Sequence, residues 1–140
     1  MTVATLFDDL PMPPCPKLLG WRVIDARPAD GWIRIGFEAR HEFTNAVGAI
    51  QGGFLAAMLD DVMGPAILLH TEGRLYSPTI SMTVNFLAPA KPGPLFGEGQ
   101  VIRLGKTVGF VEGVLMDADG GPIARASATA RLVATEKALA

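Results

Sequence analysis

Hydrophobic and polar residues alternate over much of the chain, and this alternation predicts several strands. In segment 18–40, Ile33, Ile35 and Phe37 occupy every second position, as in a strand with one buried face. The Pro-Ala-Asp-Gly sequence at 28–31 is a turn signal between two such runs. The segment therefore predicts a hairpin of two antiparallel strands.

A long apolar segment with a different pattern follows. Residues 54–69 are rich in alanine, leucine and methionine, and the segment has the length of a typical globular helix. Its apolar residues surround the predicted helix instead of forming one stripe, so we expect the rest of the fold to enclose it. Pro65 has no amide hydrogen, and we expect it to kink or locally break this helix after Gly64.

The pattern after Pro78 is again that of strands, separated by turn sequences at 89–94 and 117–121. The predicted strands cover 80–86, 95–104, 107–116 and 123–133. Gly97 and Gly99 should weaken the second of these strands. Alanines occupy every second position of the last strand, and such a small face suits close packing against a bulky element, such as a central helix.

These elements predict an α+β domain in which one curved antiparallel sheet wraps around a single long helix. The order is two strands, the helix and four further strands, and a sheet wrapped around the helix satisfies this order and explains why the helix is apolar all around. Residues 1–17 contain four prolines and no lasting periodicity, so we interpret them as an arm. The domain itself is expected to cover 18–140.

Composition and charge narrow the classes of function. The chain is 49% hydrophobic, which is high for a small soluble domain, and we expect the surplus to be buried against a second copy. A net charge of −2 with scattered lysine and arginine argues against a nucleic-acid site. No uninterrupted apolar run is long enough to span a bilayer, and the acidic N-terminus is not a secretory signal. We therefore expect a cytoplasmic protein.

Cys15 is the single cysteine, and it excludes an internal disulfide and offers no metal-ligand spacing. A catalytic thiol is a weak interpretation, since neither histidine lies near it in the sequence.

The sequence Gln51-Gly52-Gly53 precedes the predicted helix and offers backbone amides that could polarise a carbonyl group. The first amides of a helix have no partner within it, and together with the helix dipole they attract negative charge. Such an amide can stabilise the oxyanion that forms when a carbonyl is attacked. The alternative is that the two glycines only permit a sharp turn from strand to helix.

Asp60 and Asp61 are unexpected in an apolar helix, because burying an unpaired charge is costly. Adjacent helical residues lie about 100° apart around the axis, so the two carboxylates should have different surroundings and different roles. A partly buried carboxylate can act as a general base for water or attack an acyl carbon itself. Alternatively, both accept hydrogen bonds from loops or stabilise an interface between subunits.

Three segments carry a resemblance to a known family: NAVGAIQGGFLAAMLDD, SPTISMTVNFLAPAKPG and RLGKTVGFVEGVLMDADGGPIARA. They resemble the hotdog-fold acyl-CoA thioesterases, most closely the phenylacetic-acid-degradation (PaaI-type) branch. The resemblance covers residues 19 to 133. It implies a sheet wrapped around a central helix, and subunits paired into dimers that often stack into tetramers.

The resemblance also implies roles for individual residues. Asp60, nine residues after Gln51, matches the position of the catalytic carboxylate. Gly52 would donate its backbone N–H to the thioester carbonyl, and Asn45 would lie near the thioester or the attacking water. Thr79 would help to hold that water, contributed together with the aspartate by the other subunit.

The remaining candidate residues concern substrate binding. The family motif begins with His-Gly-Gly, whereas this chain has Gln51, which forms hydrogen bonds but does not titrate near neutral pH. Gly53, Met63 and Phe86 are the further candidate contacts around the acyl group. Neither His41 nor His70 occupies the family position, and we interpret both as loop residues.

Coenzyme A would meet the dimer rim, where the resemblance suggests Arg103 and Lys106 as phosphate contacts. An ordinary solvated turn explains these two charges equally well.

Hydrolysis of an acyl-CoA thioester is therefore the leading hypothesis, with coenzyme A as part of the substrate and no metal or redox cofactor. A non-catalytic acyl-CoA or lipid-binding module on the same fold is the alternative, and Gln51 is the feature that favours it. A hydratase is a weaker interpretation, because it would need a histidine paired with the acid. The sequence leaves open the acyl group and the choice between dimer and tetramer.

Overall fold

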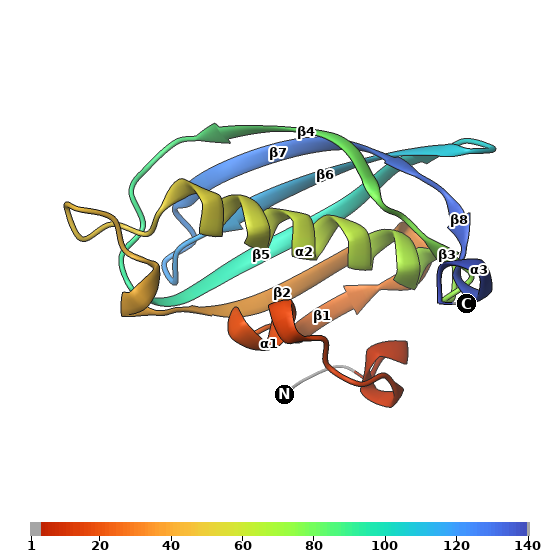
Figure 1. Cartoon of the computed structure of the whole chain (residues 1–140), viewed down its shortest axis with the longest axis horizontal. Coiled ribbons are helices and arrows are strands. Elements are labelled where there is room, and N and C mark those ends of the chain that lie inside the picture. The colour runs from red at the N-terminus through yellow and green to blue at the C-terminus, as the bar shows by residue number, and fades with distance from the viewer. Residues whose placement is uncertain (1–3, 140) are drawn as a thin grey trace.

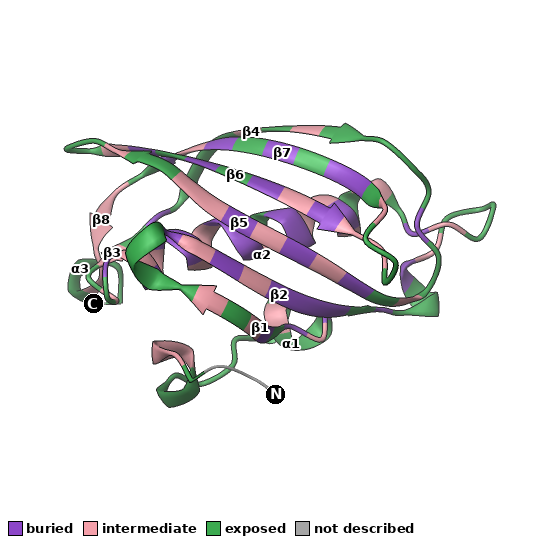
Figure 2. Ribbon diagram, turned by 180° about the vertical axis from the view of Figure 1, so that it is seen from behind, coloured by how far each residue is buried: buried purple, intermediate pink, exposed green. Residues whose placement is uncertain are grey.

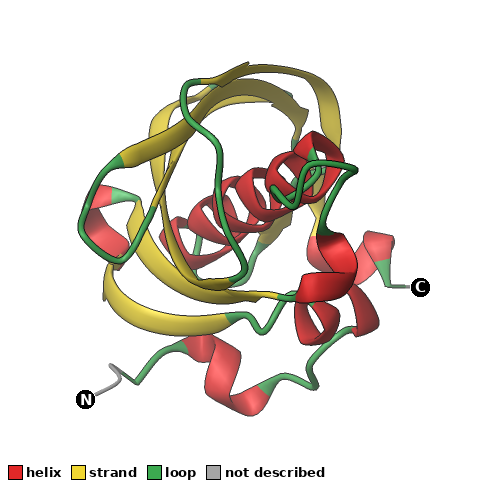
Figure 3. Ribbon diagram, turned by 90° about the vertical axis from the view of Figure 1, so that its left-hand side faces the viewer, coloured by secondary structure: helices red, strands yellow, loops and turns green. Residues whose placement is uncertain are grey.

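In the computed structural model, which describes residues 4–139, a curved antiparallel sheet encloses one long helix (Figure 1). The helix is α2, Gly52–His70. The six strands follow the order β1-β2-β5-β6-β7-β4 across the sheet. They are β1 (Arg22–Arg27), β2 (Trp32–Ala39), β4 (Thr79–Phe86), β5 (Gly93–Leu104), β6 (Val108–Met116) and β7 (Pro122–Arg131). Viewed from its end, the sheet curls around α2 (Figure 3), and the predicted architecture is confirmed.

The first hairpin forms as predicted. Strands β1 and β2 are joined by the single 3-10 turn Pro28–Asp30 (η2), and Gly31 follows it in the left-handed conformation with a φ of 66°. Glycine adopts this conformation without the steric cost that a Cβ atom brings. Figure 2 shows the alternation of buried and less buried residues along the strands, which is the pattern of a sheet with one face toward the core.

A second, small sheet departs from the prediction. The last strand ends at Arg131, and Val133–Ala134 (β8) pairs with Leu75–Tyr76 (β3), in a region expected to be a loop. A short 3-10 helix, His41–Phe43 (η3), precedes α2, and a short helix, Thr135–Ala138 (α3), follows β8. Pairs of two residues produce no periodic pattern, so the sequence carries no signal for this sheet.

Helix α2 continues through Pro65, and the break expected after Gly64 does not occur. A proline at this position leaves the carbonyl of Asp61, four residues earlier, without its helical donor. The indole nitrogen of Trp21 supplies the missing hydrogen bond from outside the helix. A neighbouring side chain thus satisfies the backbone group that Pro65 leaves free and the helix continues, while the kink expected at Pro65 stays a prediction.

Glycines bring α2 close to the middle of the sheet. A Cβ atom at Gly99 would collide with the carbonyl oxygen of Val62, and one at Gly97 would lie 2.7 Å from the Val62 side chain. Gly97 and Gly99 lie within β5, the longest strand of the sheet, and the expected weakening of this strand stays a prediction. Because the two glycines have no side chains, they allow α2 to pack closely against this strand. The alternating alanines of β7 are buried, as predicted: Ala124, Ala126, Ala128 and Ala130.

The N-terminal arm contains two short helices and packs outside the sheet (Figures 1 and 3). Leu6–Asp9 (η1) lies within the predicted arm, and Pro14–Leu18 (α1) extends one residue beyond it. The ring of Phe7 packs edge-on against Trp21, with centroids 5.2 Å apart. The boundary between arm and domain after residue 17 stays a prediction.

Among the described residues, α2 is the one helix long and apolar enough to cross a membrane by length and composition. Its position inside the sheet accounts for that composition, because eight of its residues are buried in the core.

Candidate active site

A cavity of about 310 Å³ lies between the N-terminal arm, α2 and the segment that precedes β4. Asp60 and Asp61 contribute to its wall, together with Thr79. The other lining residues are mostly apolar: Phe7, Leu10, Pro11, Met12, Pro13 and Pro16 of the arm, with Trp21, Gly64, Pro65, Leu68, Tyr76, Ser77 and Pro78. The cavity therefore combines a large apolar wall with two carboxylates on one side.

Asp60 accepts a hydrogen bond of 2.8 Å from the hydroxyl of Thr79. Thr79, the first residue of β4, thus holds one carboxylate oxygen of Asp60, which is exposed on α2. The second oxygen has no donor among residues 4–139 and is accessible to water. The sequence-predicted pair Asp60 and Thr79 is brought together within one chain.

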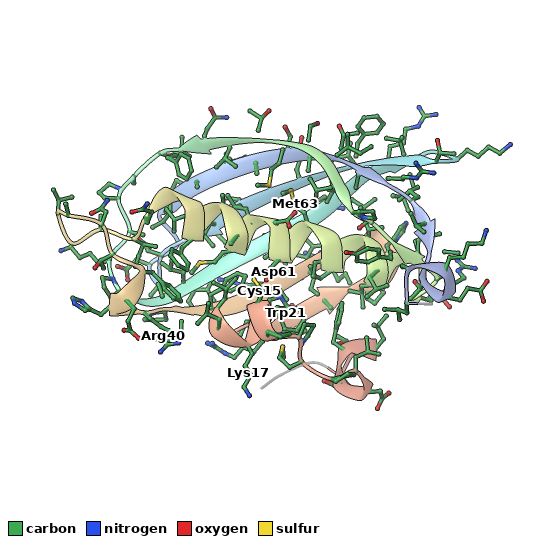
Figure 4. The ribbon with its side chains drawn as sticks, in the orientation of Figure 1. Cys15, Lys17, Trp21, Arg40, Asp61 and Met63 are labelled. Carbon is green, nitrogen blue, oxygen red and sulfur yellow. The ribbon has the colours of Figure 1, made fainter. Side chains whose placement is uncertain are left out.

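Asp61 has different surroundings, as the helical geometry predicts. Burial and, as the smaller cause, the negative charge of Asp60 raise the pKa of this carboxyl to about 6, and a hydrogen bond from Cys15 opposes the shift. The Cys15 thiol donates to Asp61 over 3.8 Å, and Cys15, Trp21 and Asp61 are adjacent in Figure 4. Burial and the charge of Asp61 raise the pKa of the thiol. Cys15 is therefore a poor nucleophile, in agreement with the weak case for a catalytic thiol.

The N-terminus of α2 forms a second group of candidate residues. The amides of Gly52 and Gly53 have no acceptor within the described chain, as expected for the first turn of a helix. The ring of Phe86, at the end of β4, covers this position, since a Cβ atom at Gly52 would lie 3.2 Å from it. The predicted residues Gly52 and Phe86 are therefore neighbours.

Asn45 and Gln51 shape the loop that enters the helix. The side-chain oxygen of Asn45 accepts hydrogen bonds from the amides of Val47 and Ala49, at 3.0 and 3.1 Å. Its amide nitrogen has no acceptor among residues 4–139 and stays available as a donor. Gln51 is the N-cap residue, its side chain makes no capping hydrogen bond, and it is exposed.

Other predicted contacts lie elsewhere in a single chain. Met63 is fully buried next to Gly113 of β6 and is not part of the cavity wall (Figure 4). Arg103 and Lys106 are exposed at the β5–β6 turn. This turn lies near the C-terminal part of α2, because Leu104 at its base pairs with Gly109, and Gly109 is close to Ile67 of the helix. The roles of Met63, Arg103 and Lys106 in substrate binding stay predictions.

The histidines have structural positions. A ring nitrogen of His70 lies 2.8 Å from the carbonyl oxygen of Pro28, so it contacts the β1–β2 turn. His41 is exposed in η3. Within residues 4–139, no three histidine, cysteine or acidic residues form a cluster suited to a metal ion.

The site residues thus form two groups along one helix. Gly52 and Asp60 are eight residues apart, which corresponds to about 12 Å along a helix axis. That separation is too long for both groups of one chain to contact the same carbonyl carbon and its water.

Residues 47–124, more than half of the chain, match the Thioesterase superfamily. The chain belongs to this superfamily. Its fold and its membership confirm the predicted hotdog architecture, and they favour the enzyme over the binding module.

Individual relatives agree with this assignment. Acyl-coenzyme A thioesterase 13 of Homo sapiens is 31% identical over 83 residues, which is 59% of each chain. A crystal structure from Ralstonia eutropha, described as a thioesterase and phenylacetic acid degradation-related protein, is 33% identical. It covers 88% of this chain and 92% of its own, with a TM-score of 0.83. The PaaI-type branch is therefore confirmed.

A thioesterase from Streptococcus pneumoniae with coenzyme A has the same fold. Its TM-score is 0.74 at 19% identity, and the match covers 81% of this chain and 89% of the other. The reaction class of the superfamily, thioester hydrolysis, follows for this chain from its membership.

The sequence did not predict the cavity beside the arm. The sequence predicts only an arm for residues 1–17, although Leu10 and Met12 are apolar residues in a proline-rich segment. Apolar residues in such a segment, next to a domain with a surplus of apolar surface, are the signal that could have indicated a packed wall.

Proposed function

We propose that the protein hydrolyses an acyl-CoA thioester to the free acid and coenzyme A, at a site shared by two copies of the chain. The human relative is named an acyl-coenzyme A thioesterase, and a protein of the same fold holds coenzyme A. The pairing of Asp60 with Thr79 at the edge of an apolar cavity is the observation that carries the proposal.

In the proposed reaction, Asp60 accepts a proton from water while the water oxygen forms a bond to the thioester carbon. The carbonyl π electrons move to oxygen, and the Gly52 amide at the start of α2 stabilises that oxyanion. When the carbonyl re-forms, the carbon–sulfur bond breaks and the thiolate of coenzyme A leaves. The thiolate then takes up the proton from Asp60, and every proton and electron pair is accounted for.

Each active site requires two subunits in this scheme. Gly52 and Asp60 lie too far apart on one helix, but a two-fold axis can place the Gly52 end of one copy opposite the Asp60 end of another. Strand β4, at the edge of the sheet, supplies a surface for this pairing. Large apolar residues are exposed along it, including Ile80 at 60% and Phe86 at 54%. Such a patch is typical of an interface between subunits.

Gln51 and Asn45 complete the entrance in this proposal. Both present side-chain groups with no partner among the described residues, and an amide can orient the carbonyl or the water without titrating. The proton transfer is then assigned to Asp60 alone.

Release of free thiol from a panel of acyl-CoA substrates tests the reaction. Asp60→Ala should lower kcat at least a hundredfold and leave the oligomer seen by size-exclusion chromatography unchanged. The matched control, Asp61→Ala, should retain most of the turnover. Equal loss in the two variants, or full activity of Asp60→Ala, would contradict the assignment.

Mixing two inactive variants tests whether the site is shared. Gly52→Pro removes the amide donor, and proline is tolerated as the first residue of a helix. Gln51 already has a conformation suited to the residue before proline, with φ −59° and ψ 138°. After denaturation and joint refolding of equal amounts of Gly52→Pro and Asp60→Ala, half of the dimers should be mixed and each of these should hold one intact site, so the mixture should recover roughly a quarter of wild-type activity. No recovery would place both groups of each site in one chain.

A further inference from the structure

The cavity beside Asp60 has no assigned occupant. It begins at the Asp60–Thr79 pair and extends to the N-terminal arm, whose side chains form a large part of its wall. Its volume of about 310 Å³ lies at the small end of the range for ligand pockets. A predominantly apolar lining with a few polar groups at one side is the usual composition of a small-molecule site.

We propose that this cavity binds the acyl part of the substrate, that it selects uncharged apolar acyl groups, and that Leu10 and Met12 of the arm determine which ones are accepted. The inference rests on the proposed function, because it places the thioester carbon next to Asp60. It differs from the sequence-based expectation, which put the acyl group around Met63 and Phe86.

Continuity with the carboxylate is the first argument. A thioester whose carbonyl is attacked by water from Asp60 has its acyl chain within reach of the same cavity, since Asp60 lies in the wall. Met63 is fully buried in the core and is not accessible to an acyl group in this chain. Phe86 of the same chain lies against Gly52, at the start of α2, and does not line this cavity.

Charge is the second argument. Asp60 and Asp61 are the acidic residues of the wall, and no lysine, arginine or histidine of the described chain lines it. An acyl group that ends in a carboxylate would meet two negative groups in an apolar environment without a positive partner. Both repulsion and loss of hydration oppose its binding.

The shape of the wall is the third argument. Five of the lining residues are prolines: Pro11, Pro13, Pro16, Pro65 and Pro78. Their fixed φ angles restrict the backbone on both sides of the cavity. A wall with little freedom to lose on binding favours a group of matching size, because preorganisation lowers the cost of association.

Leu10 and Met12 are suited to a direct test, since they line the cavity while 50% and 46% exposed. A tryptophan at either position fills space without disturbing the core. Leu18, in the adjacent helix α1, is 45% exposed and outside the cavity wall. Leu18→Trp is therefore the matched control for Leu10→Trp and Met12→Trp.

Binding is measured by calorimetry with non-hydrolysable thioethers, S-hexyl-CoA and S-ethyl-CoA, on the full-length protein. Burial of one methylene changes an equilibrium constant by roughly fourfold, so the wild type should bind S-hexyl-CoA at least tenfold more tightly. Leu10→Trp and Met12→Trp should reduce this preference to about twofold or less, and Leu18→Trp should keep it. An unchanged preference in both arm variants would overturn the assignment.

The preference for uncharged acyl groups is tested by the turnover of two substrates whose acyl groups have the same number of carbon atoms. The kcat/KM for pentanoyl-CoA should exceed that for glutaryl-CoA, which ends in a carboxylate, by tenfold or more. Equal values would overturn the proposed selectivity while leaving thioester hydrolysis in place. An arm-dependent preference for S-hexyl-CoA without turnover of any acyl-CoA would instead contradict the proposed function and support the cavity as the acyl site.

Discussion

The indole nitrogen of Trp21 donates a hydrogen bond of 2.8 Å to the backbone carbonyl oxygen of Asp61. This carbonyl would accept from residue 65 in a regular helix, but residue 65 is a proline. One side chain thus satisfies the backbone group that Pro65 leaves open, and it does so beside the candidate site.

Replacing the Trp21 indole should therefore destabilise the fold, because Pro65 has no amide hydrogen to donate to the carbonyl that the indole satisfies. Trp21→Phe removes the donor and leaves a partly buried carbonyl without a partner, which costs about 1 to 3 kcal/mol of unfolding free energy. Pro65→Ala provides an amide that can donate to the same carbonyl. In urea unfolding, the penalty of Trp21→Phe should be about 1 kcal/mol smaller in the Pro65→Ala background. Equal penalties in both backgrounds would show that only ring packing was lost.

Asp61 should make stability fall as the pH rises. Its pKa is raised to about 6 by burial and by Asp60, whereas an unfolded aspartyl group titrates near 4. Below pH 4 the group is protonated in both states, and between pH 4 and 6 only the folded state keeps the proton. Above pH 6 the folded protein holds a half-buried charge, which costs about 1 to 2 kcal/mol after allowance for solvent screening.

Asp61→Asn removes this charge and should be more stable than the wild type above pH 6, with the difference disappearing toward pH 4. Unfolding by urea at a series of pH values measures the difference. The exposed Asp9→Asn is the control. A stability difference that stayed constant from pH 4 to 7 would exclude titration of Asp61 as the cause.

Thr79 should act by positioning Asp60. Thr79→Val removes a hydrogen bond to a carboxylate, worth about 1.5 to 3 kcal/mol, so kcat for acyl-CoA hydrolysis should fall at least tenfold with a smaller change in KM. Thr79→Ser retains the hydroxyl and should restore most of the rate. A similar loss in both variants would indicate that the methyl group and its packing, rather than the hydrogen bond, are required.

Gly99 should be the least replaceable glycine of the sheet. Gly99→Ala places a methyl group against the Val62 carbonyl, and the resulting displacement of α2 should cost about 2 to 4 kcal/mol. Gly53→Ala is the comparison, because Gly53 lies in α2 and its added Cβ would meet no neighbouring atom within 4 Å. That change should stabilise the helix by about 0.5 to 1 kcal/mol. Thermal unfolding of the two variants should therefore shift in opposite directions.

The periodic parts of the chain could be predicted, because burial on one face leaves a repeat in the sequence. Ile33, Ile35 and Phe37 are all fully buried in β2, as their alternation indicates, and α2 is enclosed as its all-round apolarity requires. The pairing of β3 with β8 was missed because two-residue strands have no period. Helix α2 also continues through Pro65, since the donor that stabilises it comes from Trp21, 44 positions earlier.

The candidate site was predictable in its residue types but not in its arrangement. Asp60 and Thr79 were named through a resemblance, and their hydrogen bond places both in one chain. The different surroundings of Asp60 and Asp61 followed from helical geometry. The cavity could not be derived, because it depends on how a proline-rich arm without periodicity packs against α2 and the segment before β4.

The position of the arm has a consequence for how such proteins diverge. Leu10 and Met12 lie outside the sheet and the helix and are about half exposed, so we expect substitutions there to disturb the core less than substitutions at Phe7, which packs against Trp21. If the cavity is the acyl site as proposed, new acyl preferences can arise from changes at these two arm positions, while Asp60 and Thr79 stay as they are. A fusion partner joined ahead of the arm would then alter substrate choice, and tags for this protein belong at its carboxyl end.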